Sequence, residues 1–205
     1  TGFVLYVASA VGILVVAQAL SWVQVVGQST SLGALFVTVL IREAVPILTN
    51  FLIIGRSGTA LTAELGNMRI SGEVRVLDTQ GLDPFIYLVM PRVLSLTISV
   101  FCLAVLFVAV SFSSGYLFSL LLSPAIGDPG TFIYSISSSV NPVDIVNFLA
   151  KSIIPALFTG AICCVEGLRV ETSPAEVPPA TKRALSRSVR ALFGISALVT
   201  LLTYV

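Results

Sequence analysis

The sequence predicts an all-α integral membrane protein with about five transmembrane helices and a helical elbow between the second and the third. Composition is the first reason, because 56% of the 205 residues are hydrophobic and 10% are charged, whereas an ordinary soluble domain has about 25% charged residues. The second reason is that apolar runs of about 20 residues recur, the length that crosses a hydrocarbon core. The third is that basic residues gather between these runs. A net charge of +1 offers no broad field for nucleic acid.

The candidate spans are apolar runs bounded by charged or turn-forming residues. The first run has no charged residue, and the fourth carries Lys151 near its start. The last apolar run is short, and Arg187 and Arg190 would lengthen it by snorkelling to the interface. Because the chain starts with Thr inside an apolar stretch, we expect an N-terminally truncated single domain, 1–205. The expected spans lie near residues 2–26, 31–55, 93–122, 145–165 and 187–205.

The distribution of basic residues predicts the orientation. Nine of the eleven Lys and Arg residues lie in segments 56–92 and 169–190, and segment 123–144 has none. Lys and Arg concentrate in cytoplasmic loops. Both basic segments are therefore expected in the cytoplasm, with 123–144 outside.

Segment 56–92 is much longer than a turn between antiparallel helices requires, so we expect structure within it. A helical pattern runs over 59–65, and Gly66 is expected to interrupt it. Ser71 is then a candidate N-cap for a short helix over 72–80 that ends at Gly81. A plain solvated loop is the alternative.

A second helix start is predicted at the end of the same segment. Asp83 and Pro84 form an N-cap and first-turn pair that opens a helical stretch over 85–90. Pro91 is expected to reset the backbone before the third span.

Several chemistries are excluded by the residues themselves. The chain contains no His, which removes Ser-His-Asp catalysis and His-ligated metal sites. The three cysteines lie in apolar runs and are interpreted as packing thiols. The glycine-rich stretch 55–59 lacks the GxxxxGK phosphate-binding pattern, so its small residues more plausibly permit close helix contact. We therefore expect no catalytic residue, no metal and no cofactor on this chain.

Arg42 and Glu43 are the candidate substrate-site residues, because each ionisable group in a span costs about 2.5 to 3.5 kcal/mol near the bilayer centre. Counting from Arg56 places Arg42 roughly 20 Å above the inner boundary, where it could bind a headgroup. Pro46 and Asn50 would line the same cavity. The alternative is packing, with Pro46 kinking the helix and Asn50 forming an interhelical hydrogen bond.

Two motifs resemble the signature of the MlaE (YrbE) permease family. They are Arg-Glu-Ala-Val-Pro at 42–46 and Gly-Arg-Ser-Gly-Thr-Ala-Leu-Thr-Ala-Glu-Leu-Gly at 55–66. Met68 and Arg69, Glu73, Gly-Leu-Asp-Pro at 81–84 and Pro91 and Arg92 follow in the family's order. Segments 123–141 and 171–179 match less well, as does Val74.

The resemblance implies the membrane subunit of an ABC transporter that moves phospholipids or related lipids between envelope membranes. It implies a homodimer, a separate ABC ATPase subunit that uses ATP, and an Mce-domain protein on the outer face. The elbow would dock into the ATPase, which assigns ATPase coupling to Glu64, Arg69, Glu73 and Asp83. The implied location is a bacterial inner membrane or a plastid inner envelope.

Two other classes of function remain possible from the residues alone. A proton-coupled secondary transporter could use Glu43 as its carrier, although no second buried acid or internal repeat supports it. A membrane enzyme acting on lipids would need a catalytic set that the sequence does not show.

Overall fold

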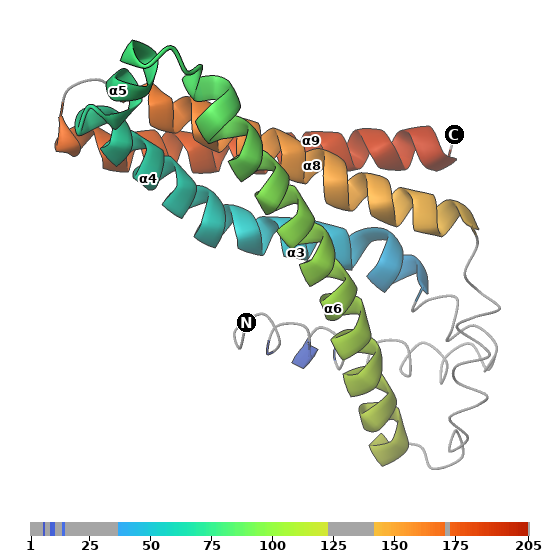
Figure 1. Ribbon diagram of the computed structural model, residues 1–205. Helices are drawn as coiled ribbons and strands as arrows, with labels where there is room; N and C mark the ends of the chain where they lie inside the picture. The colour runs from blue at the N-terminus through green and yellow to red at the C-terminus, as the bar shows by residue number, and fades with distance from the viewer. Residues whose placement is uncertain are drawn as a thin grey trace. The chain divides into compact units, whose positions relative to one another are not determined.

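The computed structural model describes residues 6, 9, 10, 14, 37–122, 142–170 and 173–204, and every regular element in those ranges is a helix (Figure 1). This agrees with the predicted all-α class. The first predicted span, 2–26, lies almost entirely outside the described residues, as does most of segment 123–144. In chain order the elements are η1 (Val37–Ala44), α3 (Val45–Ile53), η2 (Ile54–Gly58), α4 (Thr59–Ile70), α5 (Glu73–Thr79), η3 (Phe85–Val89), α6 (Met90–Leu122), α8 (Pro142–Leu168), η5 (Pro174–Glu176) and α9 (Val177–Tyr204).

Four helices in the described ranges are long and apolar enough to cross a membrane. They correspond to the second to fifth predicted spans, but their limits differ from the predicted ones. Each helix starts earlier or ends later than predicted, because the helical backbone continues into the residues that flank the apolar run. Their limits are Ile41–Ile70, Phe85–Ser114, Pro142–Leu168 and Pro174–Thr203.

Gly66 does not interrupt the helix after the second span, contrary to the prediction. The helix continues to Ile70, and Gly66 is buried against the start of α9. A Cβ at Gly66 would lie 3.3 Å from Val170 Cγ2 and 3.4 Å from Val177 Cγ2. Packing that requires a missing side chain therefore outweighs the low helix propensity of glycine. The elbow between helices shortens to residues 71–83.

The short helix in the elbow is confirmed, although its N-cap is not Ser71. Gly72 occupies that position with φ +82°, and the Ser71 hydroxyl donates to Met68 O at 3.3 Å and to Glu73 Oε1 at 3.0 Å. The predicted stop at Gly81 is confirmed, with φ +75°.

The end of α5 is a Schellman motif. The Gly81 N–H donates to Asp78 O and the Leu82 N–H donates to Leu77 O, both at 3.1 Å. This pair of bonds satisfies two terminal carbonyls, and it requires the positive φ that glycine adopts at low cost.

The predicted helix start at Asp83 is confirmed. Asp83 Oδ1 accepts from the Phe85 N–H at 2.9 Å, and Asp83 O accepts from the Tyr87 N–H at 3.1 Å. Pro91, however, does not reset the backbone, because helix runs from Pro84 through Leu122. Residues Phe85–Val89 are π-helical, and the Met90 N–H donates to Phe85 O. This shifted hydrogen-bond register accommodates the missing N–H of Pro91 within the helix.

The chain divides into two compact units. Unit 1 comprises Thr1–Pro46 and Leu103–Leu149, and unit 2 comprises Ile47–Cys102 and Ala150–Val205. In unit 2 the elbow packs on the helices through a buried cluster of Leu65, Val74, Leu88, Val89 and Cys164.

Small residues bring α4 and α8 close together in unit 2. A Cβ at Gly167 would lie 2.8 Å from Thr62 O, and a Cβ at Gly58 would lie 3.1 Å from Cys163 Sγ. The Thr62 hydroxyl donates across this contact to Cys163 O at 3.1 Å. The expectation of close helix contact at the glycine-rich stretch is thus confirmed. Cys163 and Cys164 are buried packing thiols, whereas Cys102 is exposed.

Candidate functional site

Arg42 forms a bidentate ion pair in unit 1. Its Nε lies 2.7 Å from Asp144 Oδ1, and its Nη2 donates to Asp144 Oδ2 at 3.2 Å. The Asp144 side chain is 1% exposed and that of Arg42 is 24% exposed. A carboxylate buried in the first turn of α8 therefore fixes the plane of the guanidinium, and two parallel bonds hold it more rigidly than one.

An apolar cavity of about 290 Å³ lies in the same unit, and its lining exposes no polar surface. Ile41 precedes Arg42, and Ile145 follows Asp144. Neighbouring residues on a helix differ by about 100° in direction, so the two helices present the ion pair on one side and cavity wall on another. The lining residues are Ile41, Val105, Val108, Ala109, Ile145 and Phe148.

The other three predicted substrate-site residues lie in η1 and α3. Glu43 is half-buried beside Arg42 in η1, and Pro46 is buried at the start of α3. The irregularity at Pro46 takes the form of the π-helical turn that precedes it. In unit 2, Asn50 is 1% exposed, and its Nδ2 donates to Lys151 O at 3.3 Å. Asn50 thus makes the interhelical hydrogen bond of the packing alternative.

The four predicted coupling residues all lie in unit 2, and they differ in their contacts. Arg69 is exposed in the last turn of α4, and Glu73 is exposed in the first turn of α5. Asp83 is exposed and caps the next helix. Glu64 is turned to α6, where it accepts from Arg92 Nη2 at 2.9 Å. All four side chains are exposed, but only Glu73 and Asp83 lie in the elbow itself, and Arg69 lies just before it.

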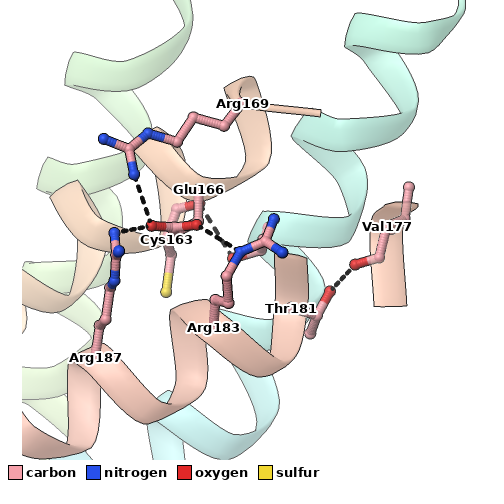
Figure 2. A network of polar contacts seen from close by, with 8 residues as sticks. Cys163, Glu166, Arg169, Val177, Thr181, Arg183 and Arg187 are labelled. Carbon is pink, nitrogen blue, oxygen red and sulfur yellow. Dashed lines mark hydrogen bonds and ion pairs between the residues drawn. The ribbon is translucent and has the colours of Figure 1, made fainter. Parts of the chain in front are cut away.

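A buried carboxylate cluster that the sequence interpretation missed joins the C-terminal end of α8 to the N-terminal part of α9. Figure 2 shows Arg169, Arg183 and Arg187 converging on the Glu166 carboxylate. Arg169 Nη1 lies 3.2 Å from Oε1, Arg183 Nε lies 3.4 Å from Oε2, and Arg187 also pairs with Oε1. The Glu166 side chain is 2% exposed, whereas those of the arginines are 46% to 58% exposed.

Two sequence signals could have indicated this cluster. Glu166 directly follows an apolar run, where a carboxylate requires a partner, and Arg169 lies three residues further on the same helix face. Arg183 and Arg187 are spaced i, i+4 on the next helix, so both can reach one acid. The sequence interpretation treated Arg183 only as a topology marker and Arg187 also as a snorkelling residue.

The comparisons agree with the resemblance found in the motifs. The family model described as Permease MlaE matches residues 1–202. The chloroplastic protein TRIGALACTOSYLDIACYLGLYCEROL 1 of Arabidopsis thaliana is 31% identical over 170 residues, which are 82% of this chain and 47% of that protein. A probable ABC transporter permease protein of Synechocystis is 30% identical over 167 residues, 82% of this chain and 63% of the relative.

A third relative is the intermembrane phospholipid transport system permease protein MlaE of Haemophilus influenzae. It is 29% identical over 176 residues, which are 85% of this chain and 67% of the relative. The chain thus spans about half to two-thirds of the length of these relatives. With four helices able to cross a membrane and a family match along nearly its whole length, this multi-pass membrane protein belongs to the MlaE permease family.

Proposed function

We propose that this chain is the permease subunit of an ABC transporter that moves phospholipids or related lipids between envelope membranes. The observation that carries the proposal is the arrangement in unit 1, where a bidentate arginine–aspartate pair is one residue away from an apolar cavity of about 290 Å³. A phospholipid has the same two parts, a charged phosphate and apolar chains. The names of the relatives from Haemophilus and Synechocystis support the same function.

In this proposal Arg42 contacts the lipid phosphate and the cavity takes part of an acyl chain. Asp144 is the positioning residue, because it orients the guanidinium through two of its nitrogens. A guanidinium suits this role, since its planar donors match phosphate oxygens better than an ammonium does. Glu43 and Pro46 would shape the same part of the helix.

Energy would come from a separate ABC ATPase, which uses ATP, while this chain binds no cofactor. Glu73 and Asp83 offer exposed charges on the elbow for docking, Arg69 offers one next to it, and Glu64 would act through α6. We further infer a homodimer, an Mce-domain protein on the outer face, and five spans with the elbow in the cytoplasm. The membrane would be a bacterial inner membrane or a plastid inner envelope.

Lipid bound per mole of folded protein tests the role of Arg42. Arg42→Ala should lower it severalfold, and Arg42→Lys should restore it only in part. Because Arg42→Ala leaves Asp144 buried without its ion pair, stability should fall as well. The double variant Arg42→Met with Asp144→Leu removes both charges, so it should recover stability but not lipid. Arg190→Ala, at an exposed arginine, is the control.

Normal lipid content in the stable double variant would exclude Arg42 as the phosphate ligand. The transport proposal has its own test, which is transfer of fluorescent phospholipid between vesicles by the full-length protein reconstituted with its ATPase. Transfer should require ATP. ATP-independent transfer, or none with an active ATPase, would contradict the proposal.

A further inference from the structure

A second cavity lies in unit 2, on the face where the helix of α3 to α4 meets α6. Its volume is about 300 Å³. The lining residues between 53 and 64 are spaced by three or four positions, so they lie on one face of their helix. Those between 92 and 99 likewise lie on one face of α6. The lining residues are Ile53, Ser57, Leu61, Glu64, Arg92, Ser95, Leu96 and Ser99. We call this the Arg92 groove.

The Arg92 groove changes character along its length. Glu64 and Arg92 lie at the end next to the elbow, and three exposed serines follow. Ile53 lies at the far end, inside the predicted span. Leu61 and Leu96 lie among the serines, so the groove has one charged end and a wall of mixed hydroxyl and apolar side chains. A phospholipid likewise has a charged headgroup at one end, followed by its glycerol and acyl chains.

The charged end contains an acid and a base side by side. Arg92 Nη2 donates to Glu64 Oε1 at 2.9 Å and to Met68 Sδ at 3.3 Å. Arg92 Nη1 is buried and has no hydrogen-bond partner in the described part of the chain. The Arg92 side chain is 21% exposed, so an oxygen-rich group seated in the groove could pair with the accessible part of the guanidinium. Glu64 is 62% exposed and accessible to a second charged group.

We propose that the Arg92 groove binds a phospholipid with a zwitterionic, amine-bearing headgroup at the elbow side of the membrane. The phosphate would pair with Arg92, and the ammonium would donate to Glu64. The inference deepens the proposed function and rests on it, because it names a lipid class for a lipid permease. It adds a site separate from the Arg42 cavity, which lies in the other unit.

The charge balance favours this class over an anionic lipid. Glu64 largely neutralises Arg92 at 2.9 Å, so a headgroup with a phosphate alone would meet a carboxylate as well as a guanidinium. A purely structural ion pair between α4 and α6 would explain the contact between Glu64 and Arg92. It would not by itself explain the groove of about 300 Å³ that opens beside the pair.

Photo-crosslinking of the full-length protein in vesicles tests the inference. The probes are phosphatidylethanolamine and phosphatidylglycerol, each with a diazirine in the acyl chain near the glycerol, and mass spectrometry measures adducts on the groove face of α6. Adducts of phosphatidylethanolamine should exceed those of phosphatidylglycerol about fivefold, as a partly exposed ion pair would produce. Glu64→Gln should abolish this preference, and Arg92→Lys should lower phosphatidylethanolamine adducts.

Asp78→Asn is the matched control, since it removes an exposed acid from α5 outside the groove, and it should keep the preference. Equal labelling by the two lipids in the parent protein, or a preference that survives Glu64→Gln, would overturn the inference. Labelling requires no ATP, so the two proposals are separable. Selective adducts without ATP-driven transfer would support lipid binding in the Arg92 groove and contradict the transport function. ATP-driven transfer without selective adducts would contradict only the proposal for the groove.

Discussion

Glu166→Gln should destabilise the protein more than any single change at the three arginines around it. The variant keeps the size of the side chain but removes the negative charge that three guanidinium groups share. One amide oxygen can still accept from one or two of them. What is lost is the charge pairing, and what remains is mutual repulsion of three clustered cations.

The exposure of the partners sets the magnitude. Each arginine is about half exposed, so each pair contributes at most about 1 kcal/mol and together they contribute about 2 kcal/mol. That is below the 3 to 5 kcal/mol of a broken fully buried pair, because the arginines left behind remain hydrated. The midpoint of thermal unfolding should fall by about 4 to 8 °C. Arg169→Gln should cost about 1 kcal/mol or less, because two arginines remain on the carboxylate.

Thermal unfolding can be followed in detergent with a thiol-reactive fluorophore. Cys163 and Cys164 are buried and become reactive on unfolding, and the exposed Cys102 is first replaced by Ser. Asp78→Asn is the control for loss of an exposed carboxylate. Because the arginines are partly hydrated, high salt should reduce the difference between Glu166→Gln and the parent.

A midpoint for Glu166→Gln within about 1 °C of the parent would refute this account. It would mean that the desolvation of the carboxylate cancels its pairing with the arginines. A loss of stability that does not change with salt would show that packing, and not charge, holds α8 to α9.

Two further predictions concern backbone features. Gly167→Ala places a Cβ 2.8 Å from Thr62 O, so it should lower the free energy of unfolding by about 1 to 3 kcal/mol. Gly194→Ala places a Cβ that meets no atom within 4 Å, so it should be neutral or stabilising. Equal thermal midpoints for the two variants would exclude close packing of α4 on α8. Asp83→Ala removes a helix cap and should lower the free energy of unfolding by about 1 kcal/mol, whereas Asp83→Asn should stay near the parent. If Asp83→Asn lowers ATPase stimulation without changing the thermal midpoint, Asp83 contacts the ATPase in addition to capping the helix.

Turns and caps of the elbow could be predicted because their causes lie within a few residues. Gly81 has a positive φ and closes two hydrogen bonds to α5, and Asp83 caps the helix that Pro84 opens. Gly66 and Pro91 were misjudged for the opposite reason. The burial of Gly66 against Val170 and the shifted hydrogen bonds before Pro91 come from the surrounding structure, and no short segment contains that information.

The candidate site was only half predictable. Arg42 stands out because a charge in an apolar run is costly, but its partner Asp144 is 102 residues away and was assigned to a loop. The Arg92 groove was not predicted either, although Glu64 and Arg92 were both noted in the family motifs. Which acid reaches which base depends on the rotation of each helix about its axis, and a list of spans does not determine that rotation.

The sequence by itself determined the membrane class, the helical fold and the order of the spans, because an apolar backbone segment in lipid must satisfy its hydrogen bonds internally and a helix does so locally. Tertiary structure alone decided the pairing of charges and the cavities. Gly167 lets α4 and α8 approach closely, while Glu166 meets Arg183 between α8 and α9 and Glu64 meets Arg92 between α4 and α6. Long-range register is a property of packed side chains, so it exists only once the helices are assembled.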